Sequence, residues 1–139
     1  MLYYTEAMME RLFTYEEAND LVPWLEERFA AMQPLRTELV DEQENLLGLL
    51  RRRRSNGHSS SEEEIAAAEN VVTRLTHRLQ DAVKEITDRG ILVRDIGRGL
   101  VDFPSNREGK IVHLCWQRGE PSIDWWHPTD TGFAGRRRL

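Results

Sequence analysis

Hydrophobic positions between residues 32 and 86 repeat at every third or fourth residue, which is typical of helices with one apolar face. The first stripe is Met32, Leu35, Leu39, Leu46 and Leu50, with Gln43 as a polar interruption. The second stripe comprises Ile65, Ala68, Val72, Leu75, Leu79, Ala82 or Val83, and Ile86. Two stripes of similar length, separated by a short polar segment, predict a long antiparallel helical hairpin with coiled-coil-like packing.

Helix-end signals bound both predicted helices. Thr14 with Glu17, and Ser61 with Glu64, have the spacing of capping boxes, in which hydroxyl and carboxylate satisfy backbone donors of the first turn. Gly90 supplies the left-handed residue that commonly ends a helix. We therefore predict a first helix over residues 13–54, a loop over 55–61 and a second helix over 62–89.

Two prolines interrupt the first predicted helix. Each removes a backbone donor and crowds the carbonyl group four residues earlier. We expect a break at Pro23 and a kink or second break at Pro34.

After Gly90 the pattern changes to short β-branched and aromatic runs separated by glycine-containing turns, which predicts strands. The short connections favour a four-stranded antiparallel meander over residues 90–127, with Pro104 and Pro121 outside the strands. Residues 128–139 are predicted to form an irregular tail, and residues 1–12 a flexible extension. The expected fold is therefore α+β, with residues 13–139 as a single domain.

Composition limits the location of the chain. The sequence has no apolar run long enough for a membrane span, and acidic Glu6 and Glu10 stand where a signal peptide would be basic. A single cysteine, Cys115, excludes an internal disulfide and fits a reducing compartment. We expect a cytoplasmic protein.

The net charge of −5 conceals an asymmetry between the two halves. Residues 1–90 carry 11 basic and 18 acidic side chains, whereas residues 91–139 carry 8 and 6. The second half, with Arg107, Lys110, Arg136 and Arg137, is thus the better place for an anion. The excess is too small to predict nucleic-acid binding.

Polar residues of the predicted sheet are the candidates for a site. Asp102, Cys115, Glu120 and His127 are residue types that bind divalent metals such as zinc, although their spacing matches no established zinc pattern. The alternative is structural: Cys115 as a small buried hydrophobe, Asp102 as a turn cap and His127 bonded to a backbone carbonyl. Both interpretations stay open.

Two further chemical roles, a thiol nucleophile and an anion-binding site, each have a structural alternative. Cys115 with His113 or His127 could form a thiol nucleophile, but His113 and Cys115 would share one strand face without an orienting third group. Arg98 and Arg136 lie beside glycines, where a phosphate or carboxylate could approach. The alternative for these arginines is an internal ion pair with Asp95, Asp102 or Glu120.

Several short motifs occur in a fixed order along the chain. They are Phe13-Thr14-Tyr15-Glu16-Glu17-Ala18-Asn19, Pro23-Trp24-Leu25, Asp95-Ile96, Gly99-Leu100-Val101-Asp102-Phe103-Pro104, Leu114-Cys115-Trp116, Gly119-Glu120-Pro121, Trp126-His127 and Gly132-Phe133-Ala134-Gly135-Arg136. Together they resemble a bacterial family known as domain of unknown function 2203, sometimes labelled division initiation protein. The resemblance implies a single fold and a cytoplasmic location, and it does not imply a substrate.

Two functions of different classes follow. The first is a non-catalytic interaction or scaffolding protein that forms a homo-oligomer through its helical hairpin. The alternative is a metal- or small-anion-binding protein with a site on the C-terminal sheet. No motif of high specificity for catalysis is present, so the sequence leaves open whether the protein is an enzyme.

Overall fold

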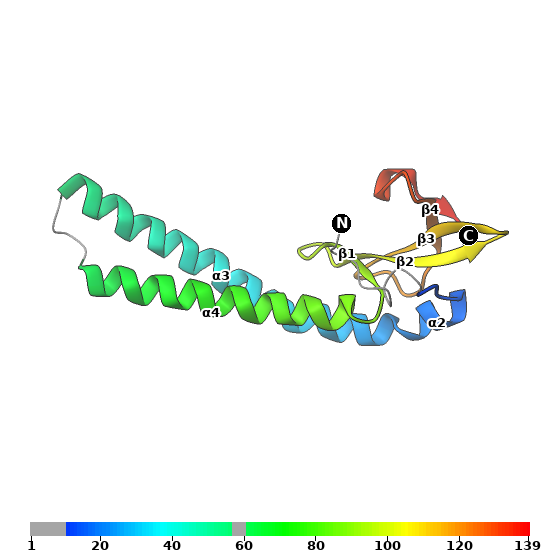
Figure 1. Cartoon of the computed structure of the whole chain (residues 1–139), viewed down its shortest axis with the longest axis horizontal. Helices are drawn as coiled ribbons and strands as arrows, with labels where there is room; N and C mark the ends of the chain where they lie inside the picture. Colours follow the sequence, from blue (N-terminus) through cyan, green and yellow to red (C-terminus); the bar gives the residue numbers. More distant parts are fainter. Residues whose placement is uncertain (1–10, 57–60) are drawn as a thin grey trace. The chain divides into compact units, whose positions relative to one another are not determined.

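The structure, a computed structural model, describes residues 11–56 and 61–139. Helices come first and an antiparallel sheet follows, as expected for an α+β protein (Figure 1). The helices are α2 (Tyr15–Asp20), α3 (Val22–Asn56) and α4 (Glu62–Thr87), with a short 3-10 turn η1 (Phe133–Gly135) near the C-terminus. The strands are β1 (Leu92–Asp95), β2 (Leu100–Arg107), β3 (Lys110–Gln117), β4 (Trp125–Pro128) and β5 (Arg137–Arg138). The predicted extension lies almost wholly outside the described residues, as does most of the predicted 55–61 loop. Residues 55 and 56 of that predicted loop belong to α3, which ends at Asn56. No helix of the described chain is long and apolar enough to cross a membrane.

Both predicted capping boxes form. The Glu17 N–H donates to Thr14 Oγ1 at 3.1 Å, and the Thr14 N–H donates to Glu17 Oε1 at 2.8 Å. Ser61 and Glu64 make the same reciprocal pair at 3.0 and 3.2 Å. These bonds satisfy donors that a helix leaves unpaired in its first turn, so α2 and α4 begin where the sequence places them.

The two prolines behave differently. Pro23 is the second residue of α3, directly after the α2 helix ends at Leu21, where a proline needs no intrahelical donor. Pro34 lies inside α3, which continues through it, so of the kink or second break expected there the break does not occur.

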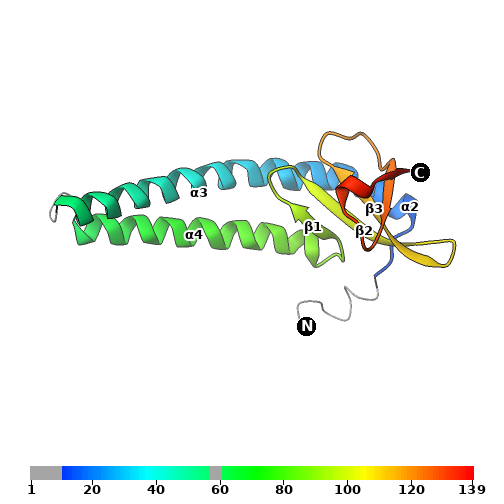
Figure 2. The same ribbon diagram turned by 90° about the horizontal axis from the view of Figure 1, so that it is seen from above.

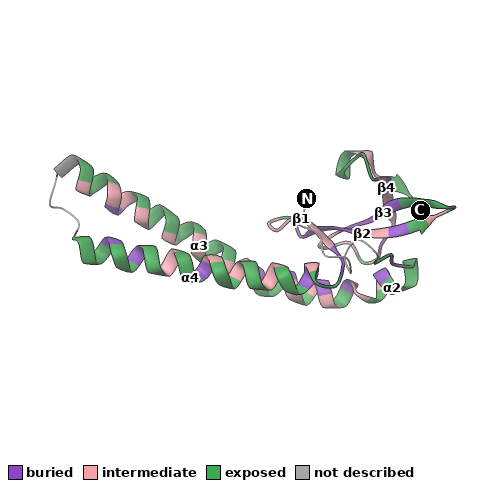
Figure 3. Ribbon diagram, viewed as in Figure 1, coloured by how far each residue is buried: buried purple, intermediate pink, exposed green. Residues whose placement is uncertain are grey.

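The described chain divides into two compact units. One unit is Ala31–Ala82, where α3 and α4 lie side by side in both views (Figures 1 and 2). Its buried residues include Leu49, Ile65 and Ala68, against which Leu46 and Leu50 pack. In α3 the predicted stripe is buried at Met32 and half-buried at its leucines, while Leu49, which the prediction did not include, is buried. Most other helix positions of the unit are exposed (Figure 3).

The other unit comprises the chain up to Ala30 together with Val83–Leu139. One face of its sheet packs on the helical segments, with Phe13 edge-on to Phe103 at 5.1 Å and Phe29 at 6.3 Å from Trp116 between ring centroids. All four of these aromatic side chains are essentially inaccessible to solvent. The opposite face, which carries Asp102, is therefore left for other contacts.

The sheet has five strands in the order β1-β2-β3-β4-β5, so the prediction of four strands and an irregular tail is wrong. Strand β5 pairs with β4 in the register Trp125↔Arg138 and Trp126↔Arg137. The guanidinium groups of Arg138 and Arg137 lie 5.3 and 5.1 Å from the centroids of those tryptophan rings. Strand β5 therefore packs through cation–π stacking of its arginines and lacks the alternating apolar residues by which a strand is recognised in a sequence.

Pro104 lies inside β2, contrary to the prediction that it would bound a strand. Its carbonyl accepts a hydrogen bond from the Phe13 N–H at 2.8 Å, on the side away from β3 and beyond the end of β1. The amide nitrogen of a strand residue faces the same side as its carbonyl. The proline therefore removes no donor that the ladder to β3 requires.

Candidate functional site

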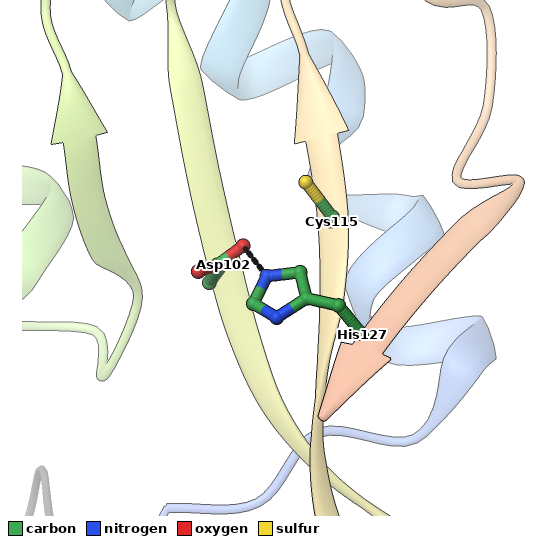
Figure 4. Close-up of side chains that lie close together, drawn as sticks. All are labelled: Asp102, Cys115 and His127. Carbon is green, nitrogen blue, oxygen red and sulfur yellow. Dashed lines mark hydrogen bonds and ion pairs between the residues drawn. The ribbon is translucent and has the colours of Figure 1, made fainter. Parts of the chain in front are cut away.

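Three adjacent strands bring Asp102, Cys115 and His127 together (Figure 4). Strand alternation places them on the sheet face opposite to that of Trp116. Asp102 of β2 lies opposite Cys115 of β3. His127 of β4 lies opposite His113, which is two residues before Cys115 and so shares its face. The antiparallel register thus gathers residues that are 25 positions apart in sequence.

The three side chains form a compact buried cluster. One potential ligand atom from each, the Asp102 carboxylate oxygen, the Cys115 sulfur and a His127 ring nitrogen, lies within 4.8 Å of the other two. Asp102, Cys115 and His127 are 2%, 1% and 1% exposed. A tetrahedral ion bound at about 2.0–2.3 Å separates its ligand atoms by about 3.3–3.8 Å, so shifts of about 1 Å would suffice to enclose a metal.

Both ring nitrogens of His127 face oxygen atoms that accept hydrogen bonds. Nδ1 lies 2.8 Å from the Pro128 carbonyl oxygen and Nε2 lies 3.0 Å from Asp102 Oδ1. A neutral imidazole has one N–H, so it can donate to one of them while its other nitrogen lone pair faces the second oxygen. A cation shared by Nε2 and Oδ1 resolves this conflict, with Nδ1–H donating to the carbonyl as metal-bound histidines usually do. The competing solution is a buried imidazolium paired with the carboxylate.

Asp102 is the centre of a larger network. Arg94 Nε donates to Asp102 Oδ2 at 2.9 Å, and His113 Nδ1 lies 3.6 Å from the same oxygen. His113 Nδ1 is buried and has no hydrogen-bond partner among the described residues, and its ring meets the His127 ring edge-on at 5.4 Å. A polar atom buried without a partner is costly, so His113 Nδ1 is the natural additional donor for a metal at this position.

Burial sets the protonation of the other two candidates. It raises the pKa of the Cys115 thiol to about 12, with the Asp102 charge acting in the same direction. It also lowers the pKa of His113, an effect that the nearby Asp102 charge opposes in part. At neutral pH the thiol without a metal is protonated, which disfavours the thiol-nucleophile interpretation, whereas a neutral His113 is ready to bind a metal.

Glu120, the fourth predicted metal residue, is engaged elsewhere. Its Oε1 accepts from the Gln117 N–H at 2.7 Å and from Arg136 Nη2 at 2.7 Å. The carboxylate thus fixes the turn after β3, and Arg136 makes the internal ion pair that was the alternative to an anion site. Arg98 donates to Gln117 Oε1 at 3.0 Å and stacks on Phe133 at 4.4 Å. Neither arginine is poised for a ligand at the Asp102 cluster.

A hollow of about 370 Å³ reaches Asp102, which is the one member of the cluster among its lining residues. Arg94, Leu100 and Asp102 line one side of it, and Thr129 to Phe133 line the other. An ion or a small ligand therefore has a route to the carboxylate.

The sequence analysis considered His113 only as a partner of Cys115 in a nucleophile, and it gave Arg94 no role in the site. The alternation of β3 already placed His113 on the face of Cys115, which was the available signal. Arg94 reaches Asp102 because β1 pairs with β2 in a register that places Leu92, two residues before Arg94, opposite Asp102. Local sequence contains no trace of that pairing.

Comparison with known proteins identifies a family and no characterised relative. Residues 11–139 match the model of the family described as "Uncharacterized conserved protein (DUF2203)". No curated protein and no solved structure matches the chain.

Proposed function

We propose that this chain, which belongs to the DUF2203 family, is a metal-binding protein that holds zinc between Asp102, Cys115 and His127. The observation that carries the proposal is the pair of acceptor oxygens around His127, which leaves Nε2 and Oδ1 facing each other at 3.0 Å. A divalent cation bound by Nε2 and Oδ1 leaves the single N–H of a neutral imidazole on Nδ1, where it donates to the Pro128 carbonyl, so both contacts of His127 are satisfied. His113 is positioned to complete the donor set.

The donor types favour zinc over harder ions. Thiolate and imidazole ligands select zinc among the abundant divalent metals, whereas magnesium and calcium require oxygen ligands. Zinc binding replaces the proton of the Cys115 thiol, because the metal is bound by the thiolate form. The proposal retains the cytoplasmic location expected from the sequence, where a reducing environment keeps the thiol unoxidised.

Metal content tests the proposal directly. Protein purified without an affinity tag is expected to retain one zinc ion per chain by elemental analysis after dialysis. His127→Ala removes the nitrogen ligand and should weaken zinc affinity by more than about 100-fold, since loss of an outer-sphere partner alone costs about 10–100-fold. Affinity is measured by competition with a chromophoric chelator.

The matched control is His77→Ala, which removes an exposed histidine of α4. Its zinc content and affinity should equal those of the wild type. Wild-type protein that binds no stoichiometric metal, or an equal loss in both variants, would exclude the proposed centre.

Self-association is the second candidate function, with α3 and α4 forming a coiled-coil-like antiparallel hairpin. Val40 and Leu47, seven residues apart on α3, are 43% and 50% exposed, so they lie on one helix face with apolar surface to cover. We expect a dimer by sedimentation at tens of micromolar protein, and a monomer when both residues are changed to glutamate. A wild type that stays monomeric at high micromolar concentration would end this candidate.

A further inference from the structure

A second hollow, of about 860 Å³, opens beside Trp126. It is formed by the turn end of the β2–β3 pair, by β4 and by the segment that follows β4. Its lining includes the cationic side chains of Arg107, Lys110 and Arg137. Asp102, Cys115, His113 and His127 do not line it, although it shares Thr129 to Thr131 with the hollow that reaches Asp102.

Trp126 holds two of these cations in place. The guanidinium carbons of Arg107 and Arg137 lie 4.8 and 5.1 Å from the centroid of the Trp126 ring. Arg137 is the register partner of Trp126 across β4 and β5, and Arg107 is the partner of Lys110 at the end of β2 and β3. Stacking on an aromatic ring fixes a guanidinium plane and leaves its N–H edge free to donate.

These three cations lack the carboxylate partners that their neighbours have. Arg94, Arg118 and Arg136 each pair with an acidic side chain. Within residues 11–56 and 61–139, no ion pair or side-chain hydrogen bond involves Arg107, Lys110 or Arg137. Their donors are therefore available to a ligand.

The charge of the lining limits the class of ligand. Glu108 and Asp130 also line the hollow, so the three cations exceed the two carboxylates by one charge. A long polyanion would meet both carboxylates, whereas one compact dianion can contact the cationic side chains of the lining alone. The Ile111 side chain, 48% exposed, and the Trp126 ring supply apolar contact for an organic group.

We propose that the Trp126 hollow binds the phosphate group of a small organic phosphate through the cationic side chains that line it, Arg107, Lys110 and Arg137. The planar donor edges of the two arginine side chains match phosphate oxygens, and Lys110 adds a third positive charge. In the described chain none of the three basic residues hydrogen-bonds or ion-pairs with Asp102, Cys115 or His127, so the phosphate proposal does not rest on the zinc centre.

Inorganic phosphate is the probe for this site. Titration at constant ionic strength should shift the Trp126 indole N–H resonance, assigned with Trp126→Phe, along a saturable curve. Arg107→Gln with Arg137→Gln should weaken phosphate binding at least tenfold, since each hydrogen bond to a charged group contributes about tenfold or more. Lys110→Gln, at an exposed position, should weaken it in the same direction.

Two variants provide contrast. Arg138→Gln changes a neighbouring arginine that stacks on Trp125 outside the hollow, and it should leave phosphate affinity unchanged. Glu108→Gln removes a negative charge from the lining and should tighten phosphate binding a few-fold. Absence of saturable binding, equal effects of Arg138→Gln and the double substitution, or binding of a single-stranded oligonucleotide at this site in place of phosphate would overturn the proposal.

Discussion

Replacing Asp102 by alanine is expected to lower the free energy of unfolding by about 3–5 kcal/mol, the cost of removing one partner from a buried charged network. Asp102 is 2% exposed and contacts Arg94 at 2.9 Å and His127 at 3.0 Å. Its loss leaves the buried His127 ring with an unmatched Nε2, whereas Arg94 reaches solvent. Urea denaturation of the wild type and the variant measures the difference.

Asp102→Asn separates stability from metal binding. The amide keeps the shape of the carboxylate, and it can either donate to Nε2 of His127 or accept from it, so the stability loss should be less than half of that for alanine. An amide oxygen is a far weaker zinc ligand than a carboxylate, so zinc affinity should still fall at least tenfold.

Asp124→Ala is the matched control for the alanine substitution. Asp124 is half-buried and accepts from Ser122 Oγ at 3.0 Å, and the described residues show no ion pair to it. Its removal should cost about 1 kcal/mol. An Asp102→Ala variant as stable as Asp124→Ala would show that Asp102 is not the centre of the network.

Local signals in the sequence identified much of the fold. Thr14 with Glu17 and Ser61 with Glu64 mark helix starts because both partners of each box lie within one turn. Gly90 has φ of +90° and lies so close to Arg11 that a side chain would clash, so its place after α4 also follows from its residue type. Sequence suffices where the stabilising contacts are local.

The parts that were missed depend on distant partners. Strand β5 is two arginines long and exists through pairing with Trp125 and Trp126, which no local pattern reports. Pro104 is tolerated within β2 because its nitrogen faces away from β3, on the side where Phe13, 91 positions earlier, donates a hydrogen bond to the Pro104 carbonyl. Such residues acquire their role from register and from neighbouring elements.

The residues of the candidate site also divide into those that local sequence could identify and those that depend on distant partners. Residue type and strand alternation selected Asp102, Cys115 and His127, and the register then brought all three together. Glu120 has the right chemistry for a ligand, but its nearest donor, the Gln117 N–H, is three residues away in the same turn. A carboxylate beside a tight turn often accepts hydrogen bonds from the backbone of that turn. His113 needed knowledge of the strand opposite, where it faces His127.

The protonation state of the Cys115 sulfur distinguishes a zinc centre from a buried ion-pair network most sharply. A cation at the cluster must displace the proton of a thiol whose pKa is otherwise raised to about 12. Without a metal, the sulfur stays a protonated, inert hydrophobe. Cobalt(II) occupies tetrahedral zinc sites and reports thiolate ligation through a charge-transfer absorption band in the near ultraviolet.

The decisive measurement is therefore the absorption spectrum of the metal-free protein titrated with cobalt(II), for the wild type and for Cys115→Ser. We predict that one equivalent of cobalt gives the wild type intense tetrahedral visible bands and a thiolate charge-transfer band, and that the serine variant lacks the charge-transfer band. A wild type that shows the weak spectrum of hydrated cobalt, or a charge-transfer band that survives Cys115→Ser, would contradict the assignment of this cluster as a metal centre.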